Sequence, residues 1–346
     1  MDWQHINWPA LERLRLSFLH GQAGAADYWT DETTLASYDA TFAQRIGWKW
    51  DYVLAELSRR GWSPPKAEVM DWGCGSGIAG RAFLDHFGTD LVTALRVADR
   101  SPLATRFAAE RARQKYPTLP VVAAPSEQPE ILLLSHVLTE LPPEAIQTLA
   151  DYAATAQCVL WVEPGTYEAS LQLIAVRERL RDRFHVVAPC THGECCGILT
   201  TGNERHWCHH FATSPAAVFH DPDWARFANL LGIDLRDLPL SFLVLDRRPA
   251  PGLPPGATRI IGHPRVYKPH ALLLSCDAAG VNERRLTKRA LPEIFKCIRK
   301  GEAEMLQCMR CDGTEIITMQ PLPGPPSAGV KPEAPGKNLA PPRAVN

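Results

Sequence analysis

Cysteine and histidine side chains are concentrated in one stretch of the chain, residues 190–210. Thiolates and imidazoles are the usual protein ligands of zinc and of iron–sulfur clusters. We find no export signal and therefore expect a reducing compartment, in which the ten cysteines would not form disulfides. The stretch predicts a metal site rather than thiols without metal. It contains Cys190, Cys195, Cys196 and Cys208, interleaved with His192, His206, His209 and His210.

The spacing of these cysteines lacks the C-x₂-C pairs of zinc ribbons, so a four-thiolate site must draw on distant sequence. Cys276, in an apolar run, is the natural fourth ligand. Cys195 is adjacent to Cys196, and the two could exchange roles. We interpret the other five cysteines as ordinary thiols: Cys74, Cys158, Cys297, Cys308 and Cys311.

A second motif is the glycine-rich loop from Asp71 to Gly77. It follows an apolar run and precedes a helix-like one, so a ligand there would meet a tight turn and the free N–H groups of a helix. Its D-x-G-x-G-x-G spacing differs from the dinucleotide fingerprint and resembles motif I of class I S-adenosylmethionine-dependent methyltransferases. The alternative is a plain glycine-rich turn. The expected cofactor-binding residues are Asp71, Gly73, Gly75, Gly77, Asp99 and Ser135.

Asp99 ends the next apolar run, 22 residues beyond Gly77, where a carboxylate can accept hydrogen bonds from ribose hydroxyls. The third strand-like run is followed by no acid until Glu127, so the adenine amine has no evident carboxylate partner.

Catalytic residues are not evident after the fourth strand-like run, in the segment from Ser135 to Leu141. The segment has neither the N/D-P-P-Y/F signature of amino-group methyltransferases nor a nucleophilic cysteine. His136 could act as a general base, with Glu140 orienting it at helical spacing. We favour the alternative in which His136 packs beside the ligand and Glu140 pairs locally. The catalytic group is therefore left unknown.

The elements that would position these groups follow from apolar periodicity. Residues 1–62 have helical spacing, which predicts an N-terminal helical cap. In residues 63–248, β-like and helical runs alternate, which predicts a doubly wound, Rossmann-like α/β domain with a parallel sheet. Residues 189–240 lie between two late strand-like runs and are interpreted as a cysteine-rich, metal-binding insertion.

A proline- and glycine-rich linker at 249–257 precedes a small basic C-terminal β-rich domain, predicted at 258–320. Its stretch 259–300 holds ten Lys or Arg residues against three acids, which can neutralise several RNA phosphates. The alternative is a solvated charged face. Residues 321–346 include eight prolines in 26 positions and are expected to be disordered.

The composition of the whole chain limits the class of protein. The 346 residues are 45% hydrophobic, and 37 basic against 38 acidic side chains indicate neither a polyanionic nor a membrane partner. No apolar run approaches the roughly 18 residues of a membrane span. Acidic residues near the start disfavour an organellar transit peptide. We expect a soluble, cytoplasmic bacterial protein, and its oligomeric state is not predictable.

Several motifs together resemble one family. The runs DWGCGSG, VADRSP, SHVLTEL, VEPGT, PCTHGECC and WCHHF are similar to the methyltransferase-like proteins that assist assembly of the mitochondrial small ribosomal subunit, and to their bacterial relatives. The likeness spans roughly residues 30–300. It implies a [4Fe–4S] cluster, with zinc as the alternative metal, although Gly197 stands where the family often has proline. The implied ligands are Cys190, Cys196, Cys208 and Cys276.

The resemblance implies an S-adenosylmethionine-binding, iron–sulfur protein that acts on the small ribosomal subunit or its rRNA during ribosome assembly. One hypothesis is an RNA methyltransferase that uses this cofactor. The alternative is a non-catalytic assembly factor that binds RNA. A third and weaker hypothesis is a small-molecule methyltransferase with a structural zinc.

Overall fold

Near-continuous apolar runs form the central strands of one large sheet in the computed structural model, which describes residues 3–19 and 28–322. The strand order is β3-β2-β1-β4-β5-β8-β6, with β7 paired to β8. The strands are β1 (Ala67–Trp72), β2 (Val92–Ala98), β3 (Val121–Val122), β4 (Ile131–Ser135), β5 (Cys158–Pro164), β6 (His185–Ala188), β7 (His210–Phe211) and β8 (Pro239–Asp246).

The predicted α/β fold with a parallel sheet is confirmed for β1 to β5, whose ladders are all parallel. Strand β8 is the exception, because it runs antiparallel to both β5 and β6. The chain leaves β6 at the carboxyl edge of the sheet and re-enters β8 at the same edge, where Leu240 pairs with Pro164. A parallel β8 would instead require a crossover to the far edge.

Helices cover both faces of this sheet. In β4, Ile131 and Leu133 belong to one apolar cluster and Leu132 and Leu134 to another, as the two-residue period of a strand requires. Helices α3, α4 and α5 pack in the first cluster, and α6 and α7 in the second. The bounds are α3 (Phe42–Arg59), α4 (Ile78–Phe87), α5 (Pro102–Lys115), α6 (Pro143–Ala153) and α7 (Tyr167–Leu180).

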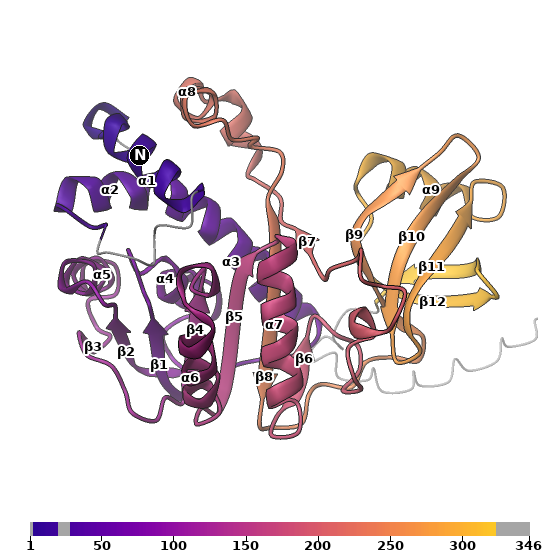
Figure 1. The fold of residues 1–346 in the computed structure, drawn as a ribbon, viewed down its shortest axis with the longest axis horizontal. Coiled ribbons are helices and arrows are strands. Elements are labelled where there is room, and N and C mark those ends of the chain that lie inside the picture. Colours follow the sequence, from indigo (N-terminus) through magenta and orange to yellow (C-terminus); the bar gives the residue numbers. More distant parts are fainter. Residues whose placement is uncertain (1–2, 20–27, 323–346) are drawn as a thin grey trace, which may run out of the picture.

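The N-terminal helices pack against a helix from much later in the chain. Helices α1 (Trp8–Leu19) and α2 (Glu32–Ala40) share an apolar cluster with α8 (Pro222–Leu231), which lies between β7 and β8. The cluster includes Leu11 and Leu35 from the first two helices and Trp224 and Phe227 from the third. Figure 1 shows α1, α2 and α8 at the same edge of the sheet.

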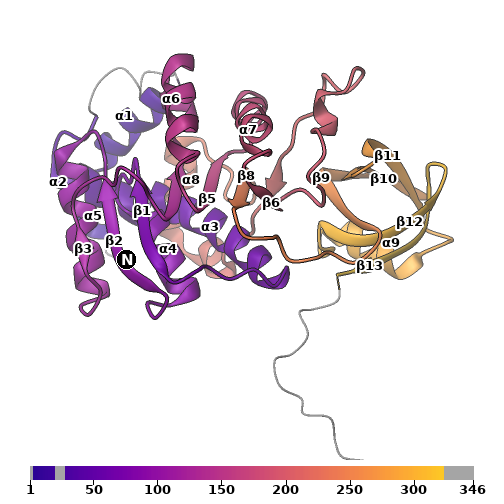
Figure 2. The same cartoon turned by 90° about the horizontal axis from the view of Figure 1, so that it is seen from below.

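Residues 257–321 form a closed barrel with the strand order β10-β11-β13-β12-β9. Ile260, Leu273, Leu286 and Phe295 are buried in its core. The barrel lies beyond the β6 end of the sheet in both views (Figures 1 and 2). Its elements are β9 (Ala257–Val266), β10 (His270–Asp277), β11 (Gly280–Thr287), α9 (Pro292–Lys300), β12 (Leu306–Asp312) and β13 (Glu315–Pro321).

Most of the basic side chains of residues 259–300 are on the barrel surface, but Arg259 is only 2% exposed and forms an ion pair with Glu56. That guanidinium is therefore not available to a phosphate. The predicted disorder of residues 321–346 falls, from residue 323 onward, outside the described residues. Among the helices that the structure describes, none is both long and apolar enough to cross a membrane.

Candidate cofactor site and cysteine cluster

The glycine-rich loop turns sharply at the carboxyl end of β1. Gly73, Gly75 and Gly77 have φ angles of 65°, 51° and 80°, in the region that favours glycine. A Cβ on Gly73 would lie 2.9 Å from Cγ1 of Val137. For Gly75 the nearest described atom would be 4.0 Å away, on the Trp29 ring. The loop is therefore tightly packed at Gly73 and has space at Gly75.

Asp71 holds the loop from inside the fold. Its carboxylate is fully buried, and Oδ2 accepts a hydrogen bond of 2.9 Å from the N–H of Gly80 in the first turn of α4. Burial raises the pKa of Asp71 to about 7, although the Gly80 N–H acts in the opposite direction. Among the described residues, Oδ1 has no hydrogen-bond partner. A buried acceptor in this state can take a donor from a bound ligand.

Asp99, just beyond β2, contacts the same loop. Its Oδ2 accepts a 2.9 Å hydrogen bond from the N–H of Gly75, and its Oδ1 accepts one of 2.9 Å from the N–H of Ser101. Each carboxylate oxygen can accept a second hydrogen bond. The structure thus brings together the predicted residues Asp99 and Gly75, and leaves acceptor capacity at the place expected for ribose hydroxyls.

A lysine that the sequence did not indicate as a site residue lies next to the end of β4. Lys49, on α3, is buried, and its Nζ lies 3.1 Å from Nε2 of His136. Desolvation lowers the pKa of Lys49 to about 7. The pKa of His136 is lowered well below its usual value by burial and then by the charge of Lys49. The available signal was the position of Lys49 on the same helical face as Val53 and Glu56, which are also buried.

The backbone at the end of β4 is conformationally constrained. His136 has a φ of 56°, the one positive φ among the described residues other than glycine. Beside it, the indole N–H of Trp50 donates a 3.0 Å hydrogen bond to Oγ of the predicted cofactor residue Ser135. Such conformations are found preferentially at functional sites, where the surrounding fold maintains them.

Glu140 is hydrogen-bonded to Tyr28, and among the described residues no hydrogen bond joins it to His136. The Tyr28 hydroxyl donates to Oε1 of Glu140 at 3.0 Å, and Arg100 is 3.8 Å from its Oε2. Burial raises the pKa of Glu140, whereas the Tyr28 hydrogen bond and Arg100 lower it. His136 therefore pairs with Lys49, while Glu140 ties the loop after β4 to the N-terminal part of the chain.

Glu163, at the end of β5, supports the loop after β4. Its Oε1 accepts hydrogen bonds from the N–H groups of Val137 and Leu138, at 3.0 and 3.1 Å, and from the Trp161 indole at 2.7 Å. Desolvation raises the pKa of Glu163 to about 7 against these donors. The carboxyl ends of β1, β2, β4 and β5 thus contribute polar groups to one edge, as ligand sites in open α/β sheets do.

The four predicted cysteine ligands come from different parts of the chain and lie close together. Cys196 and Cys276 are buried in one apolar cluster, with Cys208 packed against it. Burial raises the pKa of the Cys208 thiol, and the charges of Cys190, Cys196 and Cys276 raise it further. Cys195, in contrast, is exposed. The structure therefore favours Cys196 over Cys195 as a member of this group, which we call the cysteine cluster (Cys190, Cys196, Cys208 and Cys276).

Polar groups surround the cysteine cluster. Nε2 of His210 lies 3.6 Å from Sγ of Cys208, and Nε2 of His192 lies 3.9 Å from Sγ of Cys276. Desolvation lowers the pKa of Arg177, but the charge of Cys190 and a hydrogen bond to it outweigh that effect and raise the pKa overall. Buried thiolates beside cationic and N–H donors are typical of sites that hold a metal group. In the part of the chain that the structure describes, however, no group of three or more His, Cys, Asp or Glu residues is arranged to hold a metal ion.

A buried charge network joins the cysteine-rich segment to both domains. Glu56 of α3 forms ion pairs with Arg60, just beyond the end of that helix, and with Arg259 of the barrel. Arg60 donates to the carbonyls of Pro189 and Cys190 at 2.6 and 2.8 Å, and Arg259 donates to that of Pro189 at 3.2 Å. This network orients the backbone at the first cysteine of the cluster.

A match to a protein-family profile identifies the family of this chain. The profile described as mitochondrial small ribosomal subunit Rsm22 matches residues 58–303, which is most of the chain. The chain belongs to the Rsm22 family. The Rsm22 match includes the glycine-rich loop and all four members of the cysteine cluster, whereas Lys49 precedes it. No curated protein matches the chain significantly.

The solved structures that are similar to this Rsm22-family chain include several methyltransferases, each at low sequence identity. The magnesium protoporphyrin IX methyltransferase ChlM from Synechocystis PCC 6803, with bound SAM, has a TM-score of 0.38 and 12% identity, over 68% of this chain and 96% of its own. The plantazolicin methyltransferase BamL, in complex with SAH, has a TM-score of 0.37 and 11% identity, over 68% and 98%. A SAM-dependent methyltransferase from Aquifex aeolicus has a TM-score of 0.34 and 12% identity, over 47% and 93%.

Proposed function

We propose that this protein binds S-adenosylmethionine at the carboxyl edge of its sheet and acts on the small ribosomal subunit or its rRNA during ribosome assembly. Membership of the Rsm22 family supports the ribosomal part of the proposal. The cofactor part depends on one observation above all: Asp71 and Asp99 hold the two sides of a loop of positive-φ glycines, and Asp71 keeps an unpartnered buried oxygen there among the described residues.

The residues present fit this cofactor. The Asp71 oxygen is available to an ammonium donor, and the carboxylate of Asp99 can accept hydrogen bonds from two hydroxyls. The open side of Gly75 lets a ligand approach the backbone closely. Gly73 and Gly77 shape the turn. When bound, S-adenosylmethionine would supply an electrophilic methyl group.

Lys49 and His136 are the candidates for handling a proton if methyl transfer occurs. A lysine whose pKa is about 7 is partly neutral at physiological pH and can accept a proton. Its contact with His136 at the end of β4, next to Ser135, supports this role. We therefore propose Lys49 and His136 as the acid–base pair, in place of the His136–Glu140 pair that the sequence allowed but did not favour.

For the cysteine cluster we propose a [4Fe–4S] group held by Cys190, Cys196, Cys208 and Cys276. Burial and the charges of neighbouring thiolates raise the pKa of Cys196, Cys208 and Cys276, so these thiols are favoured in the thiolate form only when a positive group is present. Three of the thiols precede β8 and Cys276 belongs to the barrel, so the group would crosslink the two domains. The same four thiols could instead hold zinc.

One preparation tests these proposals together. The full chain is purified without oxygen, and its iron, sulfide and zinc contents are measured. Calorimetry then measures the binding of S-adenosylhomocysteine. A third assay measures the transfer of tritiated methyl groups to small-subunit rRNA. Iron and sulfide near four each per chain are expected. Zinc without iron would contradict the cluster. Tight cofactor binding without methyl transfer, together with co-sedimentation with small subunits, would favour the assembly factor that does no chemistry.

A further inference from the structure

Alternate side chains of the segment 207–211, which ends in β7, make two different sets of contacts. Cys208 and His210 lie on one face and contact each other next to the cysteine cluster. Trp207, His209 and Phe211 lie on the other. The rings of Trp207 and His209 are stacked, with centroids 4.4 Å apart, and those of His209 and Phe211 are 5.4 Å apart, edge to face.

Two further rings extend this face into a continuous row. His263 of β9 stacks on Phe211 with centroids 3.5 Å apart, and Tyr167 of α7 lies 5.9 Å from Trp207. His263 and Tyr167 are exposed, and the three rings between them are half-buried. We call Tyr167, Trp207, His209, Phe211 and His263 the ring row. Aromatic and imidazole faces are the surfaces on which proteins stack unpaired bases.

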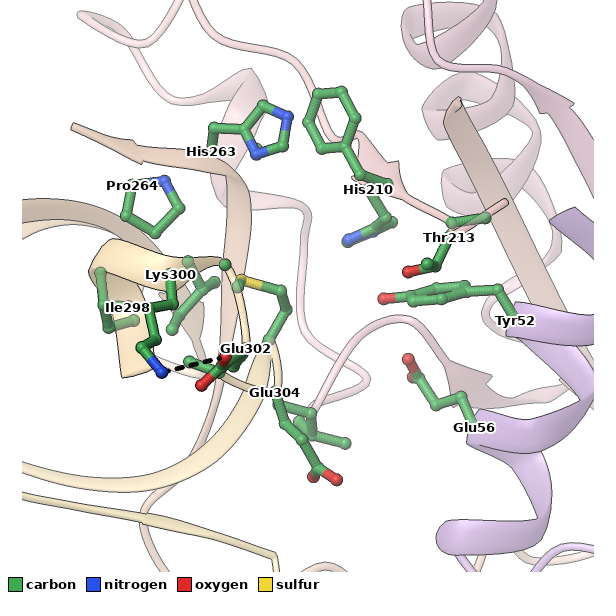
Figure 3. Close-up of a pocket in the computed structure, with 18 of the residues that line it drawn as sticks. Tyr52, Glu56, His210, Thr213, His263, Pro264, Ile298, Lys300, Glu302 and Glu304 are labelled. Atoms are coloured by element: carbon green, nitrogen blue, oxygen red, sulfur yellow. Dashed lines mark ion pairs between the residues drawn. The ribbon is translucent and has the colours of Figure 1, made fainter. Parts of the chain in front are cut away.

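The ring row ends at a pocket of about 790 Å³ between α3 and the barrel. Its size suits a nucleotide. Figure 3 shows Tyr52 and Thr213 on one side of this space and Ile298, Lys300 and Glu304 on the other. His210 also lines the pocket; it is only 1% exposed, and its Nδ1 has no hydrogen-bond partner among the described residues. A ligand with hydrogen-bonding edges could supply that partner.

The charges around the pocket favour an anionic ligand. Four of the basic residues that line it are already paired with acids, but Arg299 forms no ion pair with any residue that the structure describes. Arg299 is exposed next to Lys300, at the end of α9. The pair of Lys300 with Glu302, 3.4 Å long, is also exposed and can be exchanged for a phosphate at low cost.

We propose that this pocket binds one unstacked nucleotide of a single-stranded RNA segment, with neighbouring bases on the ring row and phosphates near Arg299 and Lys300. The proposal deepens, and rests on, the proposed action on small-subunit rRNA. Single-stranded RNA is favoured over a peptide because stacking surfaces and an unpaired guanidinium occur together with a nucleotide-sized pocket.

The first test is fluorescence anisotropy of the full chain with a labelled ten-nucleotide single-stranded RNA of mixed sequence. His263→Ala and Phe211→Ala should each weaken binding by about fivefold or more, since stacking of one base accounts for that much. Tyr267→Ala is the matched control, because this exposed barrel ring stacks on His270 outside the pocket. Equal affinity of His263→Ala and the control would overturn the proposal.

The second test removes the cation. Arg299→Ala should weaken binding and reduce the slope of log K against log salt concentration by about 0.7. Lys296→Ala, on the same helix but not lining the pocket, should leave the slope unchanged. The single-strand assignment would be excluded if duplex RNA bound as strongly as single-stranded RNA and lost as much affinity in Arg299→Ala.

The two proposals can fail separately. This inference alone would be overturned if the chain bound cofactor and small subunits, but substitutions in the ring row left its RNA affinity unchanged. Ring-row-dependent RNA binding without cofactor binding would overturn the cofactor part of the proposed function alone.

Discussion

The ammonium of Lys49 is hydrogen-bonded to the imidazole of His136, with 3.1 Å between Nζ and Nε2, at the carboxyl end of β4. Lys49 reaches this point from α3, a helix that packs against α4 and the sheet. No carboxylate takes part in this hydrogen bond. Burial is the largest influence on the pKa of Lys49 and lowers it, whereas the charge of Glu163 raises it by a smaller amount.

Replacing Lys49 by methionine should raise the thermal stability at pH 6.5, and the gain should shrink as the pH rises toward 10. The pKa of Lys49 is about 7 in the folded chain and 10.5 in the reference state. Between these pH values the unfolded chain binds more protons than the folded chain, so the free energy of unfolding rises with pH. Below pH 7 buried Lys49 lowers the free energy of unfolding by its full amount. Melting curves at both pH values test this. Lys296→Met, on an exposed position, is the control, and a gain independent of pH would refute the expectation.

If methyl transfer is detected, the same change should slow it strongly. General acid–base groups contribute about 10²- to 10⁴-fold to rates, so Lys49→Met should reduce the single-turnover rate by at least about a hundredfold. The affinity for S-adenosylhomocysteine should change less than about twofold, because no cofactor contact is assigned to Lys49. A rate equal to that of the unaltered protein would remove Lys49 from the mechanism.

Gly73→Ala should weaken cofactor binding by about tenfold or more, because the added methyl group needs a φ of 65° and would lie 2.9 Å from Val137. Gly88→Ala is a matched control. Gly88 also has a positive φ, of 78°, but no described atom lies within 4 Å of a Cβ there. The positive φ should cost both variants about 1 kcal/mol of stability, and Gly73→Ala should lose more because of the contact with Val137. Only Gly73→Ala should lose affinity in calorimetry. Equal affinities would argue against the loop as the binding site.

Glu56→Gln should destabilise the chain by about 3–5 kcal/mol, because it leaves Arg60 and Arg259 buried without their counter-charge. Urea unfolding followed by tryptophan fluorescence measures the loss. Glu304→Gln breaks the exposed pair with Arg59, 3.0 Å long, and should cost less than about 1 kcal/mol. Similar losses for the two variants would show that the buried network contributes little.

Cys208→Ser should abolish iron binding after anaerobic purification, whereas Cys195→Ser should keep the iron content of the unaltered protein. Cys208 is buried among the other thiols of the cysteine cluster, and Cys195 is exposed. Iron content and visible absorbance provide the measurement. Loss of iron in Cys195→Ser, with retention in Cys208→Ser, would reassign the ligands.

Local sequence patterns determined most of the secondary structure. The segment 69–84 predicted a strand, a tight turn and a helix, because apolar runs, glycine placement and helical periodicity act over a few residues. The fold class and the family were also predicted from sequence motifs, and they are confirmed at the level of an α/β fold with a parallel sheet and of the Rsm22 family. The roles of the individual site residues and the iron–sulfur group stay predictions.

Only the tertiary structure decided which side chains meet. Lys49 contacts His136, and Glu140 accepts a hydrogen bond from Tyr28. Arg259 is buried in an ion pair with Glu56 and is not available to a phosphate. These partners are separated by 87 to 203 residues. Residues so far apart along the chain leave no shared local period in the sequence, because their meeting depends on how whole helices and strands pack together.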